Sequence, residues 1–238
     1  MNYLPLVMLH HAGGSSRVFT ELISALPSSI EVFPLDLAGR GRRWREPPAI
    51  TVERAVDDLL LQIAENLADR DFAIFGHSMG AYLGVAIAAR LGEVCGESTR
   101  CPVLFVSANA GPRSATPLFT QDPLAAEDFE VLSVAQRFGA LAHEILQHEQ
   151  LLSRAVRLLR ADFAVCDSFI RTLAKTKVTS QLIVCYGEDD IFTESELSSW
   201  QLSSTAPAML VPFRGTHFYL AEHAAELAEV ILAQLGCP

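Results

Sequence analysis

A serine between two glycines is the side chain of this sequence best placed for nucleophilic chemistry. Ser78 stands at the centre of the run 76–80 (Gly-His-Ser-Met-Gly), between the apolar run 72–75 and the alanine-rich run 81–89. A tight turn from a strand into a helix holds such a serine in a strained backbone conformation and directs its hydroxyl away from the sheet. Glycines are required on both sides because a Cβ there would crowd the adjacent strand or helix. An ordinary turn serine is the alternative, but these flanks favour Ser78 as the nucleophile of an acyl transfer.

Such a reaction places negative charge on a carbonyl oxygen, which needs backbone N–H donors. Met79 follows the serine at the start of the helical run, where the helix dipole adds positive potential. The run 10–15 (His-His-Ala-Gly-Gly-Ser) follows the first apolar run, and its glycines let the backbone approach a bound carbonyl closely. We therefore predict an oxyanion hole formed by the main-chain N–H groups of Ala12 and Met79.

A serine hydroxyl also needs a base, which is a histidine in most such sites. His217 follows the β-rich run 209–213 through a short loop, so it should lie at the carboxyl edge of a sheet with Ser78. We predict it as the base, against the alternative of a capping or core histidine. The other histidines beyond the serine fall in an insertion or at the start of the last helical pattern: His143, His148 and His223.

The base in turn needs a carboxylate to orient it, and the chain order serine, acid, histidine places that acid before His217. The apolar run 182–186 ends in Gly-Glu-Asp-Asp at 187–190. Asp190 is preferred because a turn needs a few residues before a side chain can reach the loop of the next strand. Asp189 remains the second candidate, and at least two of these three carboxylates should be solvated turn residues.

Short apolar runs alternate with helical patterns along the chain, and these elements must position the candidate residues. Runs that are apolar throughout are typical of strands buried on both faces of a parallel sheet. The pattern predicts one α/β domain over 1–238, with a doubly wound, mostly parallel sheet flanked by helices. The strand candidates are 4–9, 31–35, 72–75, 103–107, 181–186 and 208–213, and the helical candidates are 17–26, 52–68, 79–91, 194–202 and 221–235.

One long stretch, 108–180, interrupts this alternation. We predict within it a helical lid insertion, approximately 110–178, above the carboxyl edge of the sheet. A pair of helices that only extends the core is the alternative. We identify no charged or aromatic feature there that indicates which acyl group is selected. One helical pattern carries an apolar stripe of Leu152, Ala155, Val156, Leu159, Phe163, Cys166 and Ile170, and an apolar channel or further core is suggested by Phe119, Phe129, Phe138 and Phe163.

Composition excludes several other classes of protein. The formal net charge of −10 argues against nucleic-acid binding. No apolar stretch reaches the ~18 residues of a membrane span, and the N-terminal residues do not resemble a secretory leader. Five cysteines without Cys-x-x-Cys spacing favour neither disulfides nor zinc, so we expect a cytoplasmic protein with an inert, buried Cys185. The adjacent pair His10 and His11 would point to opposite sides of an extended segment, so no metal is expected there either.

Two arginine clusters stand out against the acidic composition. They could be ordinary solvated surface, or they could bind a phosphate or an acidic partner, and the sequence leaves both interpretations open. The clusters are Arg40, Arg42, Arg43 and Arg45, and then Arg154, Arg157 and Arg160.

Taken together, these motifs resemble the type II thioesterases, the stand-alone editing enzymes of nonribosomal peptide and polyketide assembly lines within the α/β-hydrolase superfamily. The similar segments are 11–15 (His-Ala-Gly-Gly-Ser), Gly39-Arg40-Gly41 with Arg43, 76–80, 160–162 (Arg-Ala-Asp), Gly187 to Asp190 and 215–218 (Gly-Thr-His-Phe). Ala38, Arg157 and Thr216 depart from the family pattern.

The resemblance implies hydrolysis of an acyl thioester on the 4'-phosphopantetheine arm of an acyl or peptidyl carrier protein. It implies an α/β-hydrolase fold and no cofactor beyond the arm that the substrate carries. We expect a monomer that binds neither nucleic acid nor membrane. A carboxylesterase or lipase with the same catalytic residues, and a non-catalytic scaffold of this fold, are the alternatives.

Overall fold

A computed structural model describes residues 3–67, 69–95, 99–140 and 147–236 of the chain. Six strands form one sheet in the order β2-β1-β3-β4-β5-β6, and every neighbouring pair is parallel. Each predicted strand is present, within one or two residues of the expected bounds. The strands are β1 (Leu6–Leu9), β2 (Val32–Leu35), β3 (Ala73–His77), β4 (Val103–Ser107), β5 (Gln181–Gly187) and β6 (Met209–Phe213).

The helices follow the predicted pattern with local differences. The predicted helices 17–26 and 194–202 each consist of a 3-10 turn joined to a short α-helix. The last helix begins at Ala224 because 217–223 form turns. The elements are η1 (Ser16–Phe19), α1 (Thr20–Ala25), η2 (Gly41–Arg43), α2 (Val52–Leu67), α3 (Met79–Val94), η3 (Pro123–Ala125), α4 (Asp128–Arg137), α6 (Glu149–Leu173), α7 (Glu194–Ser198), η4 (Ser199–Ser203) and α8 (Ala224–Gln234). None of those described is long and apolar enough to cross a membrane.

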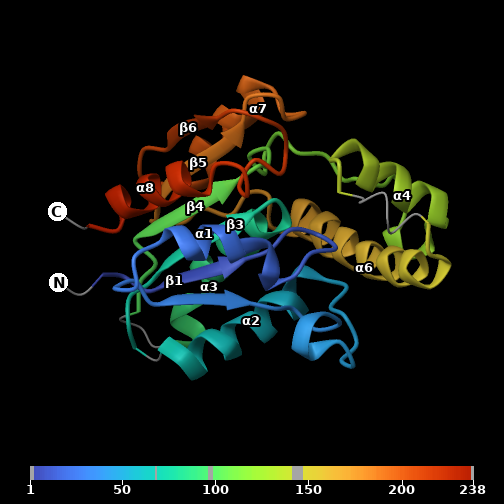
Figure 1. Cartoon of the computed structure of the whole chain (residues 1–238), viewed down its shortest axis with the longest axis horizontal. Helices are drawn as coiled ribbons and strands as arrows, with labels where there is room; N and C mark the ends of the chain where they lie inside the picture. Colours follow the sequence, from blue (N-terminus) through green and yellow to red (C-terminus); the bar gives the residue numbers. More distant parts are fainter. Residues whose placement is uncertain (1–2, 68, 96–98, 141–146, 237–238) are drawn as a thin grey trace.

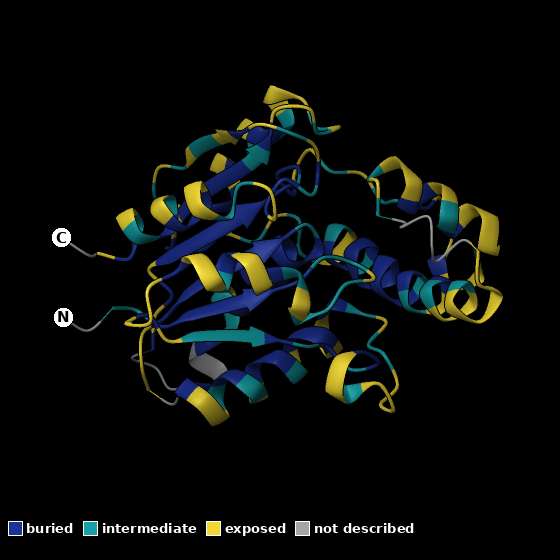
Figure 2. Cartoon of the chain, in the orientation of Figure 1, coloured by how far each residue is buried: buried dark blue, intermediate teal, exposed yellow. Residues whose placement is uncertain are grey.

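The helices cover both faces of the sheet, which confirms the predicted doubly wound α/β fold (Figure 1). Alternate residues of β1 show the two faces, since Leu6 packs with α1 and α8 and Val7 packs with α2 and α3. The inner strands β1, β3, β4 and β5 are mostly buried, the edge strands β2 and β6 are partly exposed, and the exposed residues of the helices lie on their outer sides (Figure 2). Burial on both faces explains why the strand sequences do not alternate between apolar and polar residues.

The order of the strands determines where a site can form. β1 lies between β2 and β3, so the chain leaves β1 toward one edge and later continues from β3 toward the other. A crevice opens at such a reversal, outside the carboxyl ends of the strands. The residues after β1 and after β3 therefore face the same space, and these are the segments that contain Ala12 and Ser78.

The insertion between β4 and β5 combines the two predicted alternatives. In the second half of α6, Val165, Cys166 and Phe169 join the core on one face of the sheet. In its first half, Val156, Leu159 and Phe163 pack with α4 in a separate apolar cluster. This part projects beyond the carboxyl ends of the strands with α4 (Figure 1). The predicted apolar stripe of α6 is confirmed, and a lid movement remains a prediction.

Candidate active site

Ser78 sits in the strained turn that its flanking glycines predicted. Its φ is 54° and its ψ is −113°, a conformation that an L-residue avoids. A Cβ on Gly76 would collide with the carbonyl oxygen of Gly80, and a Cβ on Gly80 would collide with that of Leu9. The Ser78 N–H donates to the Ser107 carbonyl at 2.7 Å, which ties the turn to β4. The strain is thus held by the sheet on both sides.

His217 and Asp190 complete a chain of hydrogen bonds with this serine. His217 Nε2 lies 3.0 Å from Ser78 Oγ, and His217 Nδ1 lies 3.0 Å and 3.2 Å from the two carboxylate oxygens of Asp190. The His217 and Asp190 side chains are only 3% and 2% exposed. Burial keeps the carboxylate's hydrogen bond to the ring free of competing water. The three side chains therefore have the geometry of a serine hydrolase triad.

The loops after β5 and β6 explain why Asp190 and not Asp189 reaches the histidine. The Asp189 N–H donates to the Gly215 carbonyl at 2.9 Å, and a Cβ on Gly187 would collide with the carbonyl oxygen of Thr216. This close approach places the next residue, Asp190, beneath the ring of His217, while the Asp189 side chain stays exposed. The other histidines lie elsewhere. His148 and His223 precede α6 and α8, and His143 is outside the described residues.

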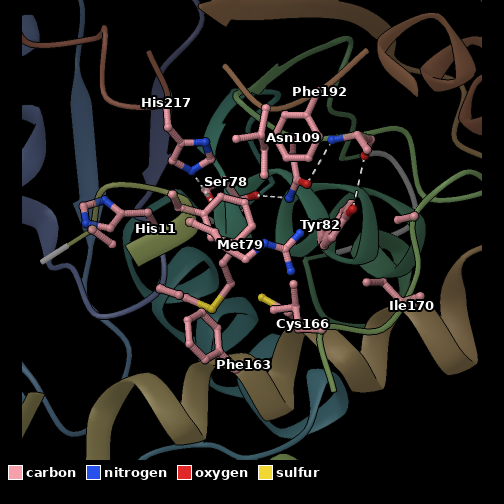
Figure 3. A pocket seen from close by; sticks show the side chains of 18 of the residues that line it. His11, Ser78, Met79, Tyr82, Asn109, Phe163, Cys166, Ile170, Phe192 and His217 are labelled. Atoms are coloured by element: carbon pink, nitrogen blue, oxygen red, sulfur yellow. Dashed lines mark hydrogen bonds between the residues drawn. The ribbon is translucent and has the colours of Figure 1, made fainter. Parts of the chain in front are cut away.

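A pocket opens beside Ser78 and His217 (Figure 3). It opens to solvent, and its empty space is about 1000 Å³ with the open mouth included. Ala12 and Met79 both line it, as the predicted oxyanion hole requires. Met79 is the first residue of α3, so its N–H has no acceptor within its own helix. The two N–H groups remain predicted donors.

Helix α6 and α4 form much of the pocket wall. Phe163, Cys166 and Ile170 reach in from α6 (Figure 3). The ring of Phe138, just after α4, lies 5.0 Å from that of His217. Of the four phenylalanines predicted to line a channel, Phe138 and Phe163 line the pocket. Phe119 packs between α4 and α6, which agrees with the alternative of further core, whereas Phe129 fits neither interpretation because it is 68% exposed.

Several pocket residues were missed by the sequence analysis. Asn109 follows β4 at the same sheet edge, and its side chain donates to the Ser78 carbonyl at 3.0 Å and accepts from the Ala110 N–H at 2.9 Å. Its position after a strand is the signal that could have identified it. The others lie in the middle or at the end of helices and carry no comparable signal: Tyr82, Arg137 and Glu196.

A buried ion pair holds the loop that contains Ala12. Both terminal guanidinium nitrogens of Arg40 donate to Asp162 of α6 at 2.7 Å, and the Gly13 N–H donates to the same carboxylate at 2.7 Å. The Arg40 and Asp162 side chains are 3% and 1% exposed. Arg40 is therefore not part of a basic surface. Arg43 and Arg160 are also occupied, because they pair with Asp58 and Asp128.

Replacing Asp162 by alanine should destabilise the protein by about 3–5 kcal/mol, because the buried charge of Arg40 would be left without a partner. The Gly13 N–H would also lose its acceptor, so the hydrolysis rate should fall. Chemical unfolding and an activity assay measure the two effects. Asp128→Ala is the matched control, since it removes an exposed ion pair of another arginine and should change stability by less than about 1 kcal/mol. Equal losses in the two variants would contradict a structural role for the buried pair.

Three neutral histidines surround the site. Burial, together with the nearby charge of Arg40, lowers the pKa of His10 to about 4. Burial likewise lowers the pKa of His11 to about 3 and holds that of His77 well below its usual value. His77 Nδ1 lies 2.8 Å from Ser107 Oγ, which in turn lies 2.8 Å from the Tyr219 hydroxyl. The His77 ring lies 5.5 Å from that of His217 and 5.9 Å from that of His11, so these two rings pack at the site without a charge that would repel protonated His217.

The same histidines predict how stability depends on pH. Below pH 6.5 the unfolded chain binds protons at these rings and the folded chain does not, so the free energy of unfolding should fall as the pH drops from about 6.5 to about 5. Each ring contributes up to about 1.4 kcal/mol per pH unit to the slope of the free energy of unfolding against pH. Urea unfolding at several pH values measures the slope. His10→Gln should make it shallower, and an unchanged slope would show that His10 titrates normally in the folded protein.

The cysteines within the described residues are free and buried: Cys95, Cys101, Cys166 and Cys185. Burial raises the pKa of Cys185 to about 12, in agreement with the inert thiol that was predicted. Cys237 lies outside the described residues. The same part of the chain contains no cluster of metal-ligating side chains.

Parallel sheets with a serine at a strained strand-to-helix turn define the serine hydrolases of the α/β-hydrolase fold, and the strand order and Ser78 turn place this chain in that class. More narrowly, the chain belongs to the Thioesterase domain family, whose model matches residues 4–235. It is thus an enzyme that hydrolyses acyl thioesters, and the predicted resemblance is confirmed.

Individual relatives agree with this assignment. The chain is 29% identical to a medium-chain S-acyl fatty acid synthase thioesterase of Anas platyrhynchos, over 93% of this chain and 87% of that one. It is 28% identical to the gramicidin S biosynthesis protein GrsT of Aneurinibacillus migulanus, over 98% and 89%. Among solved structures, it is similar to the type II thioesterase BorB from the borrelidin biosynthetic cluster, with a TM-score of 0.81 and 27% identity over 98% and 93%.

Proposed function

We propose that this protein hydrolyses acyl thioesters on the phosphopantetheine arm of a carrier protein in nonribosomal peptide or polyketide biosynthesis. The observation that carries the proposal is the hydrogen-bonded chain of Ser78, His217 and Asp190, at a pocket beside α6 in a Thioesterase family member. The names of BorB and GrsT, which tie these relatives to biosynthetic pathways of this kind, support the choice of partner.

In the first half of the reaction, Ser78 Oγ attacks the thioester carbonyl carbon while His217 Nε2 takes its proton. Asp190 accepts a hydrogen bond from His217 Nδ1–H, which fixes the ring and stabilises its positive charge. The N–H groups of Ala12 and Met79 bind the oxyanion. When the carbon–sulfur bond breaks, His217 returns the proton to the sulfur, and the arm leaves as a free thiol.

In the second half, water attacks the carbonyl carbon of the acyl-Ser78 ester. His217 accepts a proton from this water and then gives it to Ser78 Oγ as the acid is released. The enzyme itself needs no cofactor, because the phosphopantetheine arm belongs to the substrate. The buried free thiols support a reducing, cytoplasmic setting.

A basic surface near α6 suits an acidic carrier. Trp44 is 50% exposed, and the guanidinium groups of Arg45 and Arg154 lie 4.8 Å and 5.8 Å from its ring. Arg42 and Arg157 are exposed on the same two segments. None of these four arginines forms an ion pair with a described residue, although the chain carries a net charge of −10. This Trp44 surface is the part of the predicted arginine clusters left free for a partner.

A substrate panel tests the proposal. An acyl-pantetheine thioester should be hydrolysed at least about a hundredfold faster than the matched oxygen ester, a difference of about 2.7 kcal/mol in transition-state binding. The converse preference would establish the carboxylesterase alternative. Wild type should also react with a fluorophosphonate probe at Ser78, and absence of labelling would establish the non-catalytic alternative.

Charge reversal tests the surface around Trp44. Arg154→Glu should raise KM for an acyl-loaded carrier by about fivefold or more, because it replaces attraction by repulsion, and should leave KM for the acyl-pantetheine unchanged. The effect should shrink at high salt. Arg17→Glu, at an exposed arginine of η1, is the control. If both substrates respond equally, the surface does not bind the carrier.

A further inference from the structure

A single cationic side chain lines the pocket within the part of the chain that the structure describes. Arg137 ends α4, and its side chain forms part of the wall around Ser78 and His217. The next residue, Phe138, places its ring 5.0 Å from that of His217. The end of α4 is therefore held against the reacting residues, and Arg137 enters the pocket from there.

Arg137 has no ion-pair or hydrogen-bond partner among the described residues. Other arginines of the chain behave differently, since Arg40, Arg43 and Arg160 all donate to carboxylates. The pocket does contain one carboxylate, Glu196. Its Oε2 atom, however, accepts from the Thr193 N–H at 2.8 Å and from the Thr193 hydroxyl at 2.7 Å, within the cap of α7. Within the described residues, the guanidinium is thus left available to a ligand.

The surroundings make this charge significant for binding. Much of the nearby wall is apolar and aromatic, including Phe163, Ile170 and Phe192. Arg137 as a whole is exposed, so its guanidinium is hydrated until an anion of the substrate replaces that water with a charge-assisted hydrogen bond. A guanidinium also has the fork geometry that matches a carboxylate or a phosphate through two parallel bonds. A purely apolar acyl chain would leave this group without a partner.

We propose that Arg137 binds an anionic group of the substrate and thereby selects substrates that carry one. The inference rests on the proposed function and extends it to the class of acyl group. Two parts of the substrate could supply the anion: a carboxylate at the far end of the acyl chain, or the phosphate of the arm. The position in the pocket that Ser78 and His217 line favours the acyl carboxylate, because this group lies a few bonds from the carbonyl, whereas the phosphate lies at the opposite end of the arm from the sulfur.

Four non-hydrolysable ligands distinguish these sources. Each is a pantetheine analogue with an amide in place of the thioester, ending either in a 3-carboxypropanoyl group or in its neutral isostere, 3-carbamoylpropanoyl, with or without the 4'-phosphate. Calorimetry measures their Kd for wild type, Arg137→Gln and Arg137→Lys. Arg17→Gln, at an exposed arginine outside the pocket, is the matched control. The value of kcat/KM for the corresponding thioesters is measured in parallel.

Wild type should bind the carboxylate ligands about tenfold more tightly than the carboxamides, and Arg137→Gln should lose this preference. Arg137→Lys should keep part of it, since the charge remains without the fork. A preference that follows the phosphate instead would support the same role with the arm as the source. Equal affinity of wild type for all four ligands, no binding of any, or an equal change in Arg137→Gln across all four would overturn the proposal. Discrimination in binding without turnover of the thioesters would contradict the proposed function alone.

Discussion

Ser78→Ala should reduce kcat for thioester hydrolysis by about 10⁴- to 10⁶-fold. The variant keeps the turn, because Gly76 and Gly80 still permit the close approach of the strand and the helix. It loses the hydroxyl that lies 3.0 Å from His217 Nε2, so no acyl-enzyme can form. The residual rate would come from water attack supported by the oxyanion donors.

Single-turnover kinetics and mass spectrometry of the acyl-enzyme measure this effect. Wild type should show an acyl adduct on the tryptic peptide that contains Ser78, and Ser78→Ala should show none. Ser133→Ala is the matched control, because the hydroxyl of this exposed serine of α4 donates to the Phe129 carbonyl of its own helix and to no other described residue. The unfolding midpoint of both variants should stay close to that of wild type. A Ser78→Ala variant that retained most of its activity would disprove the nucleophile assignment.

Asp190→Asn should lower kcat by about 10⁴-fold with little change in KM. The carboxylate accepts a hydrogen bond from His217 Nδ1–H and balances the charge that the ring gains when it takes the serine proton. An amide cannot balance this charge. Its NH₂ group also favours the wrong tautomer, in which Nε2 carries the hydrogen and cannot accept from Ser78.

The neighbouring carboxylate provides the control for this variant. Asp189→Asn makes the same chemical change one residue away, at an exposed side chain that does not contact His217. It should hydrolyse the thioester at nearly the wild-type rate. If Asp189→Asn were the inactive variant and Asp190→Asn active, the structure of the turn after β5 would be wrong.

The sequence alone predicted the elements and candidates for all three triad positions, with Asp190 preferred to Asp189 as the acid. Runs buried on both faces are apolar throughout, and the apolar runs identified all six strands, although the edge strands β2 and β6 are only partly buried. The turn at Ser78 could be predicted because the glycines that permit it are its neighbours in sequence. His217 followed from its place after a strand, since the carboxyl ends of parallel strands meet at one edge.

The choice between Asp190 and Asp189 depended on tertiary structure. If the turn after β5 were not bonded to the next loop, the side chain of either aspartate could face His217. The pairing of Asp189 with Gly215, across two loops, determines which side chain points inward. The sequence contains both loops but not their register, because the register follows from how β5 and β6 align.

The arginines show even more clearly which properties depend on tertiary structure. Arg40 was one member of a basic cluster in the sequence, and only the fold brings Asp162, which follows it by 122 residues, into contact with it. Arg137 was not singled out at all, since nothing near it in sequence marks a pocket.

Local backbone requirements and burial are encoded in adjacent residues, so the sequence by itself determined the class of fold, the nucleophile turn and the base. Contacts between distant segments depend on how the helices of the insertion pack over the sheet. The tertiary structure therefore decided which carboxylate holds His217, which arginines remain free and which side chains line the pocket.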